Sequence, residues 1–436
     1  MTERHPLYGS RLPDPWRIIT VDEVSSPEQH SCVAGPFGSS ISSKYFVESG
    51  IPVIRGSNLS SDLERFISKG FVFVSEERAK KYKAQTVAPD DLVFTCWGTI
   101  GQTGIIPRQG PYEKYIISNK QLKLRVNTDI ADPLYIYFYF AGRDGVEHVK
   151  SYAKGAAVPG ISLGILKGLK IALPPLHVQR RIASILSAYD DLIENNTRRI
   201  AILEEMARRL YEEWFVHFRF PGHEVAGRDD KLPNGWERVP LKEIASVNPE
   251  SIKPRSAPSS INYIDIASVS PGRIDQIQAM NFVDAPSRAR RKITSGDILW
   301  SCVRPNRRSH ALVLSPEPDT VASTGFAVLR AEKVPHSYLY QAVTTDAFVA
   351  YLVNHATGAA YPAVKQTDFE VAQITVPSSG LLKKFAGIAE PMVALAHVLF
   401  QRNTNLRTQR DLLLPKLVSG EIDVSEAETA AAEAAE

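Results

Sequence analysis

The sequence predicts an α/β (α+β) fold class in which one globular domain occurs twice, each copy followed by a long helix. Three observations predict it. Residues 155–159 (Gly-Ala-Ala-Val-Pro) recur as residues 358–362 (Gly-Ala-Ala-Tyr-Pro), and residues 171–174 recur as residues 374–377, both at an offset of 203 residues. Each repeat is followed by a long heptad pattern, and 436 residues suffice for two separate cores. A repeat of this length indicates two copies of one folding unit.

The first copy alternates short β-type runs with turn residues. Residues 51–55, 91–97 and 121–126 are candidate strands, separated by clusters of Gly, Pro, Ser and Asp. Residues 132–142 begin with Asp-Pro and are rich in aromatic residues, which predicts a buried helix.

The second copy opens at residues 232–237 and follows the same plan. Residues 297–302 match residues 91–96, and residues 337–340 match residues 134–137. The middle parts of the copies differ in length and content, whereas their ends agree. We therefore expect one scaffold that carries two different variable surfaces.

Each copy ends in prolines, at residues 174–175 and at residue 377, which are followed by a long amphipathic helix. Apolar residues alternate at spacings of four and three from Ile182 to Trp214, and again from Phe385 to Leu417. The offset of 203 residues is 29 heptads, so both helices keep the same register. Each helix of roughly 40 residues is about 60 Å long and marginal alone. We expect the two to pair as an antiparallel coiled coil, with the globular copies in a pseudo-twofold arrangement.

Asn196 and Asn403 occupy positions of the heptad pattern that face the partner helix, where apolar residues would stabilise the helix pair more. One interpretation is an exposed or water-bound side chain. The alternative is a buried asparagine that restricts the helix register. In an antiparallel pair both lie near the middle, where they could face each other.

The domain boundaries follow from these elements. We expect a first globular domain over residues 1–175, its helix over 176–220, a linker over 221–233, a second globular domain over 234–377, its helix over 378–420 and an acidic disordered tail over 421–436. The tail holds six acidic residues and no basic one, so a whole-chain charge of +3 becomes +9 for residues 1–420. This body permits a polyanionic partner.

Catalytic signatures are missing from the sequence. It contains no GxxxxGKS/T phosphate loop, no HExxH and no GxSxG, and its three cysteines form no CxxC pair. We expect no enzymatic activity and no metal site. No apolar run approaches the roughly 18 residues of a membrane span, which favours a cytoplasmic chain without a membrane partner.

Basic residues gather beside one predicted strand of the second copy. Seven cations lie within twenty-one residues, on both sides of the predicted strand 297–303. Arginine can grip phosphates or pair with guanine edges, and Asn or Gln suits adenine. A solvated charged surface is the alternative. The candidate nucleic-acid contacts are Lys44, Arg55, Lys114, Asn119, Lys120, Gln121, Arg288, Arg290, Arg291, Lys292, Arg304, Asn306, Arg307 and Arg308.

Four segments carry a resemblance to a known family. They are residues 173–182 (LPPLHVQRRI), 203–207 (LEEMA), 214–216 (WFV) and 232–236 (LPNGW). With the repeat, they make the chain resemble the specificity subunit of type I restriction-modification systems. In that family the Pro-Pro-Leu-x-x-Gln-x-x-Ile motif starts the first of two spacer helices, and the Gly-Ala-Ala-x-Pro segments look like the junction between recognition domain and helix. The second copy departs from the motif, with Pro-Ser-Ser at residues 377–379 and Leu382 in place of Gln.

The resemblance implies two target recognition domains, each reading one half of a split double-stranded DNA site. It implies that the paired helices set the gap and dock two methyltransferase subunits, which methylate adenine N6 with S-adenosylmethionine. Two motor-nuclease subunits using ATP and Mg²⁺ are further implied partners, and the chain itself binds no cofactor and is non-catalytic. Alternative functions are a DNA-recognition subunit of a type IIB-like modification system, or a coiled-coil scaffold that does not read DNA.

Overall fold

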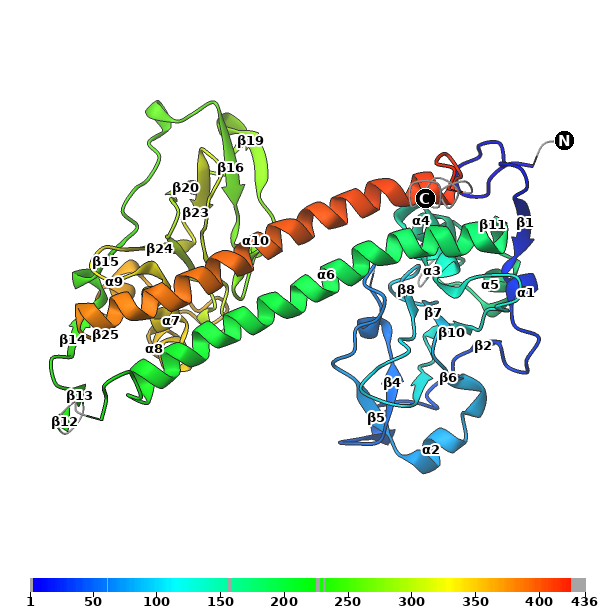
Figure 1. The fold of residues 1–436 in the computed structure, drawn as a ribbon, viewed down its shortest axis with the longest axis horizontal. Coiled ribbons are helices and arrows are strands. Elements are labelled where there is room, and N and C mark those ends of the chain that lie inside the picture. The colour runs from blue at the N-terminus through cyan, green and yellow to red at the C-terminus, as the bar shows by residue number, and fades with distance from the viewer. Residues whose placement is uncertain (1–2, 61, 156–158, 225–227, 230–231, 425–436) are drawn as a thin grey trace, which may run out of the picture. The chain divides into compact units, whose positions relative to one another are not determined.

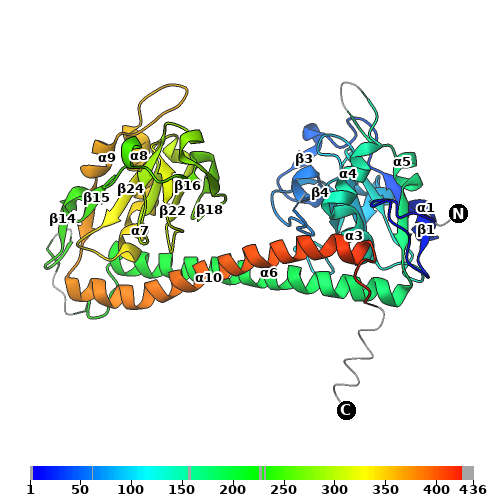
Figure 2. The same cartoon turned by 90° about the horizontal axis from the view of Figure 1, so that it is seen from above.

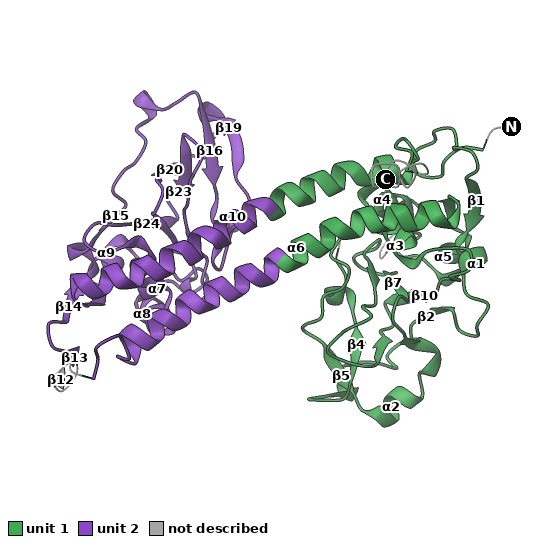
Figure 3. Ribbon diagram, viewed as in Figure 1, with its two compact units in different colours: residues 1–195, 403–436 green, residues 196–402 purple. Residues whose placement is uncertain are grey.

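The chain divides into two compact units. A computed structural model describes residues 3–60, 62–155, 159–224, 228–229 and 232–424. Unit 1 comprises residues 1–195 and 403–436, and unit 2 comprises residues 196–402 (Figure 3). Each unit therefore contains one globular part together with segments of both long helices. This confirms the predicted fold class of two α/β domains, each followed by a long helix.

Two sheets and a strand pair build the globular part of unit 1, counted over its described residues (Figure 1). The first sheet has the order β2 (Cys32–Ala34), β10 (Gln121–Leu124), β7 (Leu92–Thr95), β8 (Thr103–Ile105). The second has the order β3 (Phe46–Val47), β5 (Val72–Val74), β4 (Ile51–Ile54), β9 (Tyr115–Ile117), β6 (Thr86–Val87). The pair is β1 (Arg17–Thr20) with β11 (Lys170–Leu173).

Unit 2 repeats the first sheet and the strand pair, and its second sheet has four strands where unit 1 has five. Its sheets are β15 (Ala245–Val247), β24 (Phe326–Ala331), β21 (Ile298–Ser301), β22 (His310–Leu312) and β19 (Gln278–Asn281), β16 (Ser260–Ile264), β23 (Thr320–Ser323), β20 (Ala289–Lys292). Its strand pairs are β14 (Glu237–Pro240) with β25 (Gln373–Val376), β17 (Val269–Ser270) with β18 (Arg273–Ile274), and β12 (Arg228–Asp229) with β13 (Leu232–Pro233). Strands β4 and β9 pair in parallel, as do β16 and β23, so even the strand directions are repeated.

Three short helices before the last strand correspond between the units, α3, α4 and α5 in unit 1 to α7, α8 and α9 in unit 2, and unit 1 has two more. Unit 1 has α1 (Val21–Val24), α2 (Glu76–Lys80), α3 (Pro133–Ala141), α4 (Arg143–Ser151) and α5 (Leu163–Gly168). Unit 2 has α7 (His336–Thr344), α8 (Asp346–His355) and α9 (Gln366–Glu370). Helix α3 begins where Asp132 accepts a hydrogen bond from the Tyr135 amide at 3.0 Å, with Pro133 in the first turn. Its aromatic run is buried on all sides, which confirms the helix expected over residues 132–142.

Helices α6 (Leu176–Tyr211) and α10 (Ser379–Val418) carry the heptad pattern, and α6 continues into a π-helical turn at Glu212–Val216. The positive φ of Phe218 (59°) leaves helical geometry before residue 220, where we had expected the helix to end. The linker expected over residues 221–233 and the acidic tail lie partly outside the described residues. No helix within the described ranges is long and apolar enough to cross a bilayer.

Inside each unit the globular part packs on the long helices. In unit 1, the end of α3 lies against Leu414 of α10. In unit 2, Tyr338 of α7 contacts Phe215 and Phe385, with ring centroids 4.9 and 6.2 Å away. Figure 2 shows α3 and α7 lying directly beside the long helices. One core therefore joins the globular part of each unit to its helices.

The helix pairing in unit 1 is antiparallel, as predicted. The Asn403 side chain donates to the carbonyl oxygen of Ile193 at 3.1 Å, and Arg410 contacts Asp190 at 2.7 Å. Numbers rise along one helix as they fall along the other. Asn196 and Asn403 are only 8% and 2% exposed, which favours the buried interpretation of both residues.

Candidate nucleic-acid interface

A buried carboxylate holds the central strand of each unit. In unit 1, Asp91 accepts hydrogen bonds from Arg125 Nε and Nη2 at 2.8 and 2.9 Å, and Glu28 accepts from Nη1 at 2.9 Å. Asp91 also accepts from the Ala88 amide at 2.8 Å. The side chain of Asp91 is 1% exposed. Two-pronged contacts of this kind fix an arginine in one orientation.

Unit 2 contains the same arrangement. Asp297 accepts from Arg330 Nε and Nη2 at 2.8 and 2.9 Å, Glu250 accepts from Nη1 at 2.8 Å, and the Thr294 amide donates to Asp297 at 2.8 Å. Hydrogen bonds to Asp91 and to Asp297 raise the pKa of Arg125 and Arg330 above the ordinary arginine value. We call each set the buried fork. It joins the start of β7 to the end of β10 in unit 1, and the start of β21 to β24 in unit 2, by equivalent contacts.

The Gly-Ala-Ala-x-Pro region lies against the end of the forked strand. In unit 2 the Val364 amide donates to Cys302 O at 3.0 Å, and Val303 forms a bridge with Ala363. In unit 1 the Ile161 amide donates to Cys96 O at 3.0 Å. Since α9 and β25 follow this region in unit 2, it belongs to the globular part. The interpretation of these segments as the junction to the helix is therefore wrong; residues 156–158 lie outside the described residues.

Residues 303–308 of unit 2, here called the arginine loop, have a constrained backbone. Arg304 and Arg308 have φ of 53° and 55°, on either side of a 3₁₀ turn at Pro305–Arg307. A left-handed non-glycine residue costs roughly 1–2 kcal/mol, so the surroundings must hold this shape. The Arg304 amide donates to Pro362 O at 2.7 Å, and Arg308 pairs with Asp346. Asn306 and Arg307 are left exposed.

The other predicted cations of unit 2 differ in how far they are neutralised. Arg288 pairs with Asp265 at 2.7 Å, and Lys292 lies 4.0 Å from Glu250. Arg290 stacks on the Phe282 ring at 4.8 Å, and Arg291 donates to Ser251 Oγ at 3.4 Å. Within the described ranges, the cations of the predicted cluster that have no carboxylate within 4.0 Å are Arg290, Arg291, Arg304 and Arg307.

Unit 1 presents a different feature, a loop over residues 35–40 that we call the Phe37 loop. Phe37 is 96% exposed at its tip. Four contacts hold the loop: Gly35 N donates to Gln121 O at 2.8 Å, Asn119 Nδ2 to Gly38 O at 2.9 Å, and Arg78 and the Tyr82 hydroxyl to Ser40 O at 2.6 and 3.1 Å. An aromatic side chain that is fully exposed on an anchored loop is suited to contact a base step or another flat surface.

The remaining predicted contacts of unit 1 fall into exposed and buried groups. Lys44, Lys114 and Lys120 are exposed, whereas Arg55 is half-buried and donates to Gly70 O at 3.2 Å. Gln121 is 1% exposed, and its amide contacts Ser118, Ile54 O and Gly56 N in the interior. A side chain in this position cannot reach a base edge. Gln121 therefore leaves the set of candidate contacts, because it begins the predicted strand with its side chain pointing into the interior.

Two exposed aromatic residues were missed by the sequence reasoning. They are Phe37 and Tyr361, which is 68% exposed and lies 4.5 Å from the Arg304 guanidinium. Phe37 stands between Pro36 and Gly38, which is a turn signal. Tyr361 occupies the variable position of the repeated segment, where the first copy has Val158. The turn around Phe37 and the difference at Tyr361 can both be seen in the sequence, but neither predicts that the ring is exposed.

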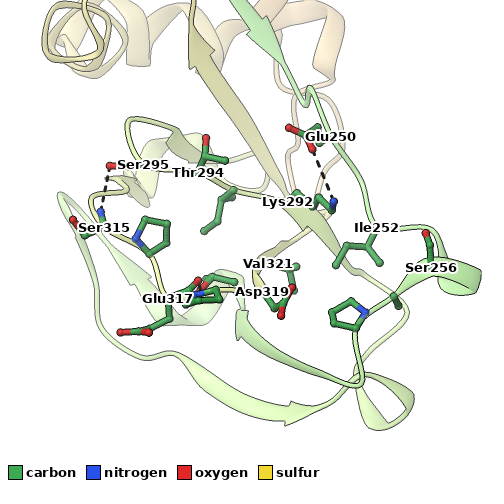
Figure 4. Close-up of a pocket in the computed structure, with 16 residues that line it drawn as sticks. Glu250, Ile252, Ser256, Lys292, Thr294, Ser295, Ser315, Glu317, Asp319 and Val321 are labelled. Atoms are coloured by element: carbon green, nitrogen blue, oxygen red, sulfur yellow. Dashed lines mark hydrogen bonds and ion pairs between the residues drawn. The ribbon is translucent and has the colours of Figure 1, made fainter.

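A groove of about 730 Å³ lies elsewhere in unit 2 (Figure 4). Its lining includes Glu250, Glu317 and Asp319 against Lys292. This excess of carboxylates makes the groove unsuited to a phosphate backbone, so we place the candidate interface on the arginine loop. Over the described residues, no group of three His, Cys, Asp or Glu side chains is arranged to hold a metal ion.

Comparisons with known proteins point to one family. Residues 38–205 match the family model described as type I restriction modification DNA specificity domain. The chain is 24% identical to the type I restriction enzyme MjaIX specificity subunit of Methanocaldococcus jannaschii, over 95% of both chains. It is 25% identical to the HindI specificity subunit of Haemophilus influenzae over 40% of each chain.

The fold has a solved counterpart as well. The crystal structure of the type I restriction-modification S subunit from M. genitalium matches with a TM-score of 0.59 and 14% identity, covering 95% of this chain and 99% of that one. The family match, the full-length relative and the repeated fold agree with the resemblance drawn from the sequence. Residues 38–205 therefore match the DNA specificity domain of type I restriction-modification systems, and the chain as a whole is similar in sequence and in fold to their specificity subunits.

Proposed function

We propose that this chain is the DNA-recognition subunit of a type I restriction-modification complex, and that each globular part contacts one half of a split DNA site. One observation carries the proposal. The same buried fork and the same order of the four-stranded sheet around it occur in both units, yet the residues that follow the forked strand differ: Trp-Gly-Thr-Ile-Gly-Gln at 97–102 and Val-Arg-Pro-Asn-Arg-Arg at 303–308. A repeated frame with different loops suits a protein that recognises two different short sequences.

The exposed side chains supply the required chemistry. Arginine pairs with guanine O6 and N7, and asparagine with adenine N6 and N7, in the major groove. Arg304, Asn306 and Arg307 in unit 2, and Asn119 in unit 1, are the proposed base contacts. Lys44, Lys114 and Lys120 are proposed phosphate contacts, which position the protein without reading sequence.

The long helices have two further proposed roles. They set the distance between the half-sites, and they dock two methyltransferase subunits. Apolar side chains remain exposed on both helices, which supports docking: Leu192, Ile202, Met206, Ile388, Leu395 and Leu412. Adenine methylation with S-adenosylmethionine, and cleavage by two motor-nuclease subunits using ATP and Mg²⁺, are assigned to the partners. The chain itself is proposed to be non-catalytic and to act in the cytoplasm, where its DNA lies.

Methylation profiling of the host tests the proposal. Removing the gene should abolish methylated adenine at one split motif. Arg307→Ala should alter only one half of that motif, because Arg307 is exposed in unit 2. A change of both halves would refute the division of labour. Steeply salt-dependent DNA binding by the complex with methyltransferase separates this function from a scaffold that does not contact DNA.

The spacing role has its own test. Inserting one heptad into each of α6 and α10 lengthens each by roughly 10 Å, which is near three base pairs at about 3.4 Å each. The methylated motif should then have a longer gap with unchanged halves. An unchanged gap would refute the spacing role. A type IIB-like system is distinguished by its partners, since there the nuclease and methyltransferase activities co-purify in a differently built assembly.

A further inference from the structure

We propose that Tyr361 is a positioning residue that orients the Arg304 guanidinium for two-pronged contact with one guanine of the half-site read by unit 2. The inference rests on the proposed function and deepens it. The Arg304 guanidinium lies 4.5 Å from the centre of the Tyr361 ring, and its Nη2 donates to Ala360 O at 3.2 Å. The ring and the carbonyl both come from the same short segment.

The backbone fixes the base of this side chain. Arg304 has a φ of 53°, and its amide donates to Pro362 O at 2.7 Å. Residues on both sides of Tyr361 therefore hold Arg304, through its backbone and through its side chain. A long flexible arginine normally loses conformational entropy when it binds, and this arrangement removes part of that loss beforehand.

The charge of Arg304 is not neutralised. Arg288 and Arg308 in the same unit each contact a carboxylate, whereas among the described residues no carboxylate lies within 4.0 Å of Arg304. A guanidinium has five N–H donors, and the bond to Ala360 O uses one. Arg304 is thus ordered by an aromatic ring and a neutral carbonyl, and it keeps donors for an acceptor pair such as guanine O6 and N7.

Tyr361 has no evident structural task. Its side chain is 68% exposed, which is unusual for a tyrosine that serves a core. The first copy has Gly98 at the position of Arg304 and Val158 at the position of Tyr361, so the pair is specific to the second copy. The stacked pair therefore occurs where the two copies must differ if they recognise different sequences.

The test compares methylation motifs of cells that express the full chain with its methyltransferase partner. Tyr361→Phe keeps the ring and should leave the motif unchanged. Tyr361→Ala removes the ring, and Arg304→Gly removes the side chain while suiting the left-handed backbone. Both variants should relax the same G·C position, lowering discrimination against other bases about 10-fold or more. The other half of the motif should not change. Val283→Ala, at an 88% exposed apolar residue of the same unit, is the control.

Several results would overturn the inference. They are an unchanged motif in Tyr361→Ala, relaxation of different positions by Tyr361→Ala and Arg304→Gly, or relaxation of both halves. Loss of specificity in Tyr361→Phe would also contradict it, because the ring alone is the proposed platform. If the wild-type chain directs no split motif, the proposed function itself fails. An unaltered Tyr361→Ala motif beside a clear wild-type motif refutes only the role of Tyr361.

Discussion

Unit 1 and unit 2 share a buried aspartate–arginine contact but differ in the loops that they expose. Asp91 with Arg125, and Asp297 with Arg330, form forks with the same two bond lengths, 2.8 and 2.9 Å. Unit 1 presents the Phe37 loop against the turn before β10, and unit 2 presents the arginine loop with Tyr361 after the forked strand β21. The comparison shows that the exposed loops can change while the buried fork and its four-stranded sheet stay the same.

The largest expected effect comes from breaking the shared frame. Asp91→Ala removes two charged hydrogen bonds of Arg125 and leaves the Ala88 amide unpaired, so it should destabilise unit 1 by about 3 kcal/mol, and Asp297→Ala should do the same to unit 2. Hydrogen exchange should show lost protection in β7 and β10 for the first variant, and in β21 and β24 for the second.

An exposed ion pair provides the control. Arg108 contacts Asp90 at 2.9 Å with its side chain 80% exposed, so Arg108→Ala should cost less than about 1 kcal/mol. If either Asp variant lowered protection equally in both units, the forks would not be local to their units.

Acid should weaken both units, and the largest contribution in each should come from one buried histidine, although burial also lowers the pKa of His148 and of His397. Burial lowers the pKa of His5 in unit 1 and of His310 in unit 2 to about 4, and the charge of Arg308 adds to the effect at His310. The unfolded chain binds these protons near pH 6.5, so stability is retained above pH 6.5 and falls between pH 6.5 and 4. The loss reaches about 3 kcal/mol per histidine, at about 1.4 kcal/mol per pKa unit.

Unfolding free energies measured across this pH range check the comparison. His5→Gln should flatten the pH dependence of unit 1 alone, and His310→Gln that of unit 2 alone. An unchanged slope in His5→Gln would show that the buried ring is not the group that titrates.

Phe37→Ala sharpens the difference between the contact surfaces. Because Phe37 is 96% exposed, its removal should leave the melting temperature unchanged. DNA binding by the complex should weaken roughly 10-fold, since stacking or wedging by one aromatic is worth about 1–3 kcal/mol. Phe37→Leu, which keeps an apolar wedge, should retain part of the affinity. Wild-type affinity in Phe37→Ala would remove the loop from the interface.

The smallest effect is expected at the helix seam. Replacing Asn196 and Asn403 by leucine should raise stability by about 1 kcal/mol, because apolar seam residues pack better, while register control is lost. Calorimetry measures the first effect, and methylation at sites with altered gaps measures the second. A lower melting temperature would mean that the Asn403 bond to Ile193 O outweighs the apolar gain.

Periodic features could be predicted from the sequence, because they are local. The heptads of α6 and α10, the aromatic helix α3 and the strands β7, β10 and β21 all follow from spacing along the chain. The buried fork could not be predicted, since Asp91 and Arg125 meet only when β7 pairs with β10 in the observed register.

The candidate contacts show the same limit. Arg304, Asn306 and Arg307 could be identified because a cluster of cations stands out in any sequence. The inward side chain of Gln121 and the outward ring of Phe37 both depend on how the loop over residues 35–40 docks on the turn before β10. No short pattern encodes that packing.

Exchanging the recognition parts tests the central claim most directly. A chain in which residues 14–174 are replaced by a second copy of residues 234–377 keeps the repeated joints at both ends. With its methyltransferase partner, this folded chain should methylate a symmetric site made of the unit 2 half-site twice, in opposite orientations. Methylation of the original asymmetric site by this chain would contradict the claim that each unit reads its own half.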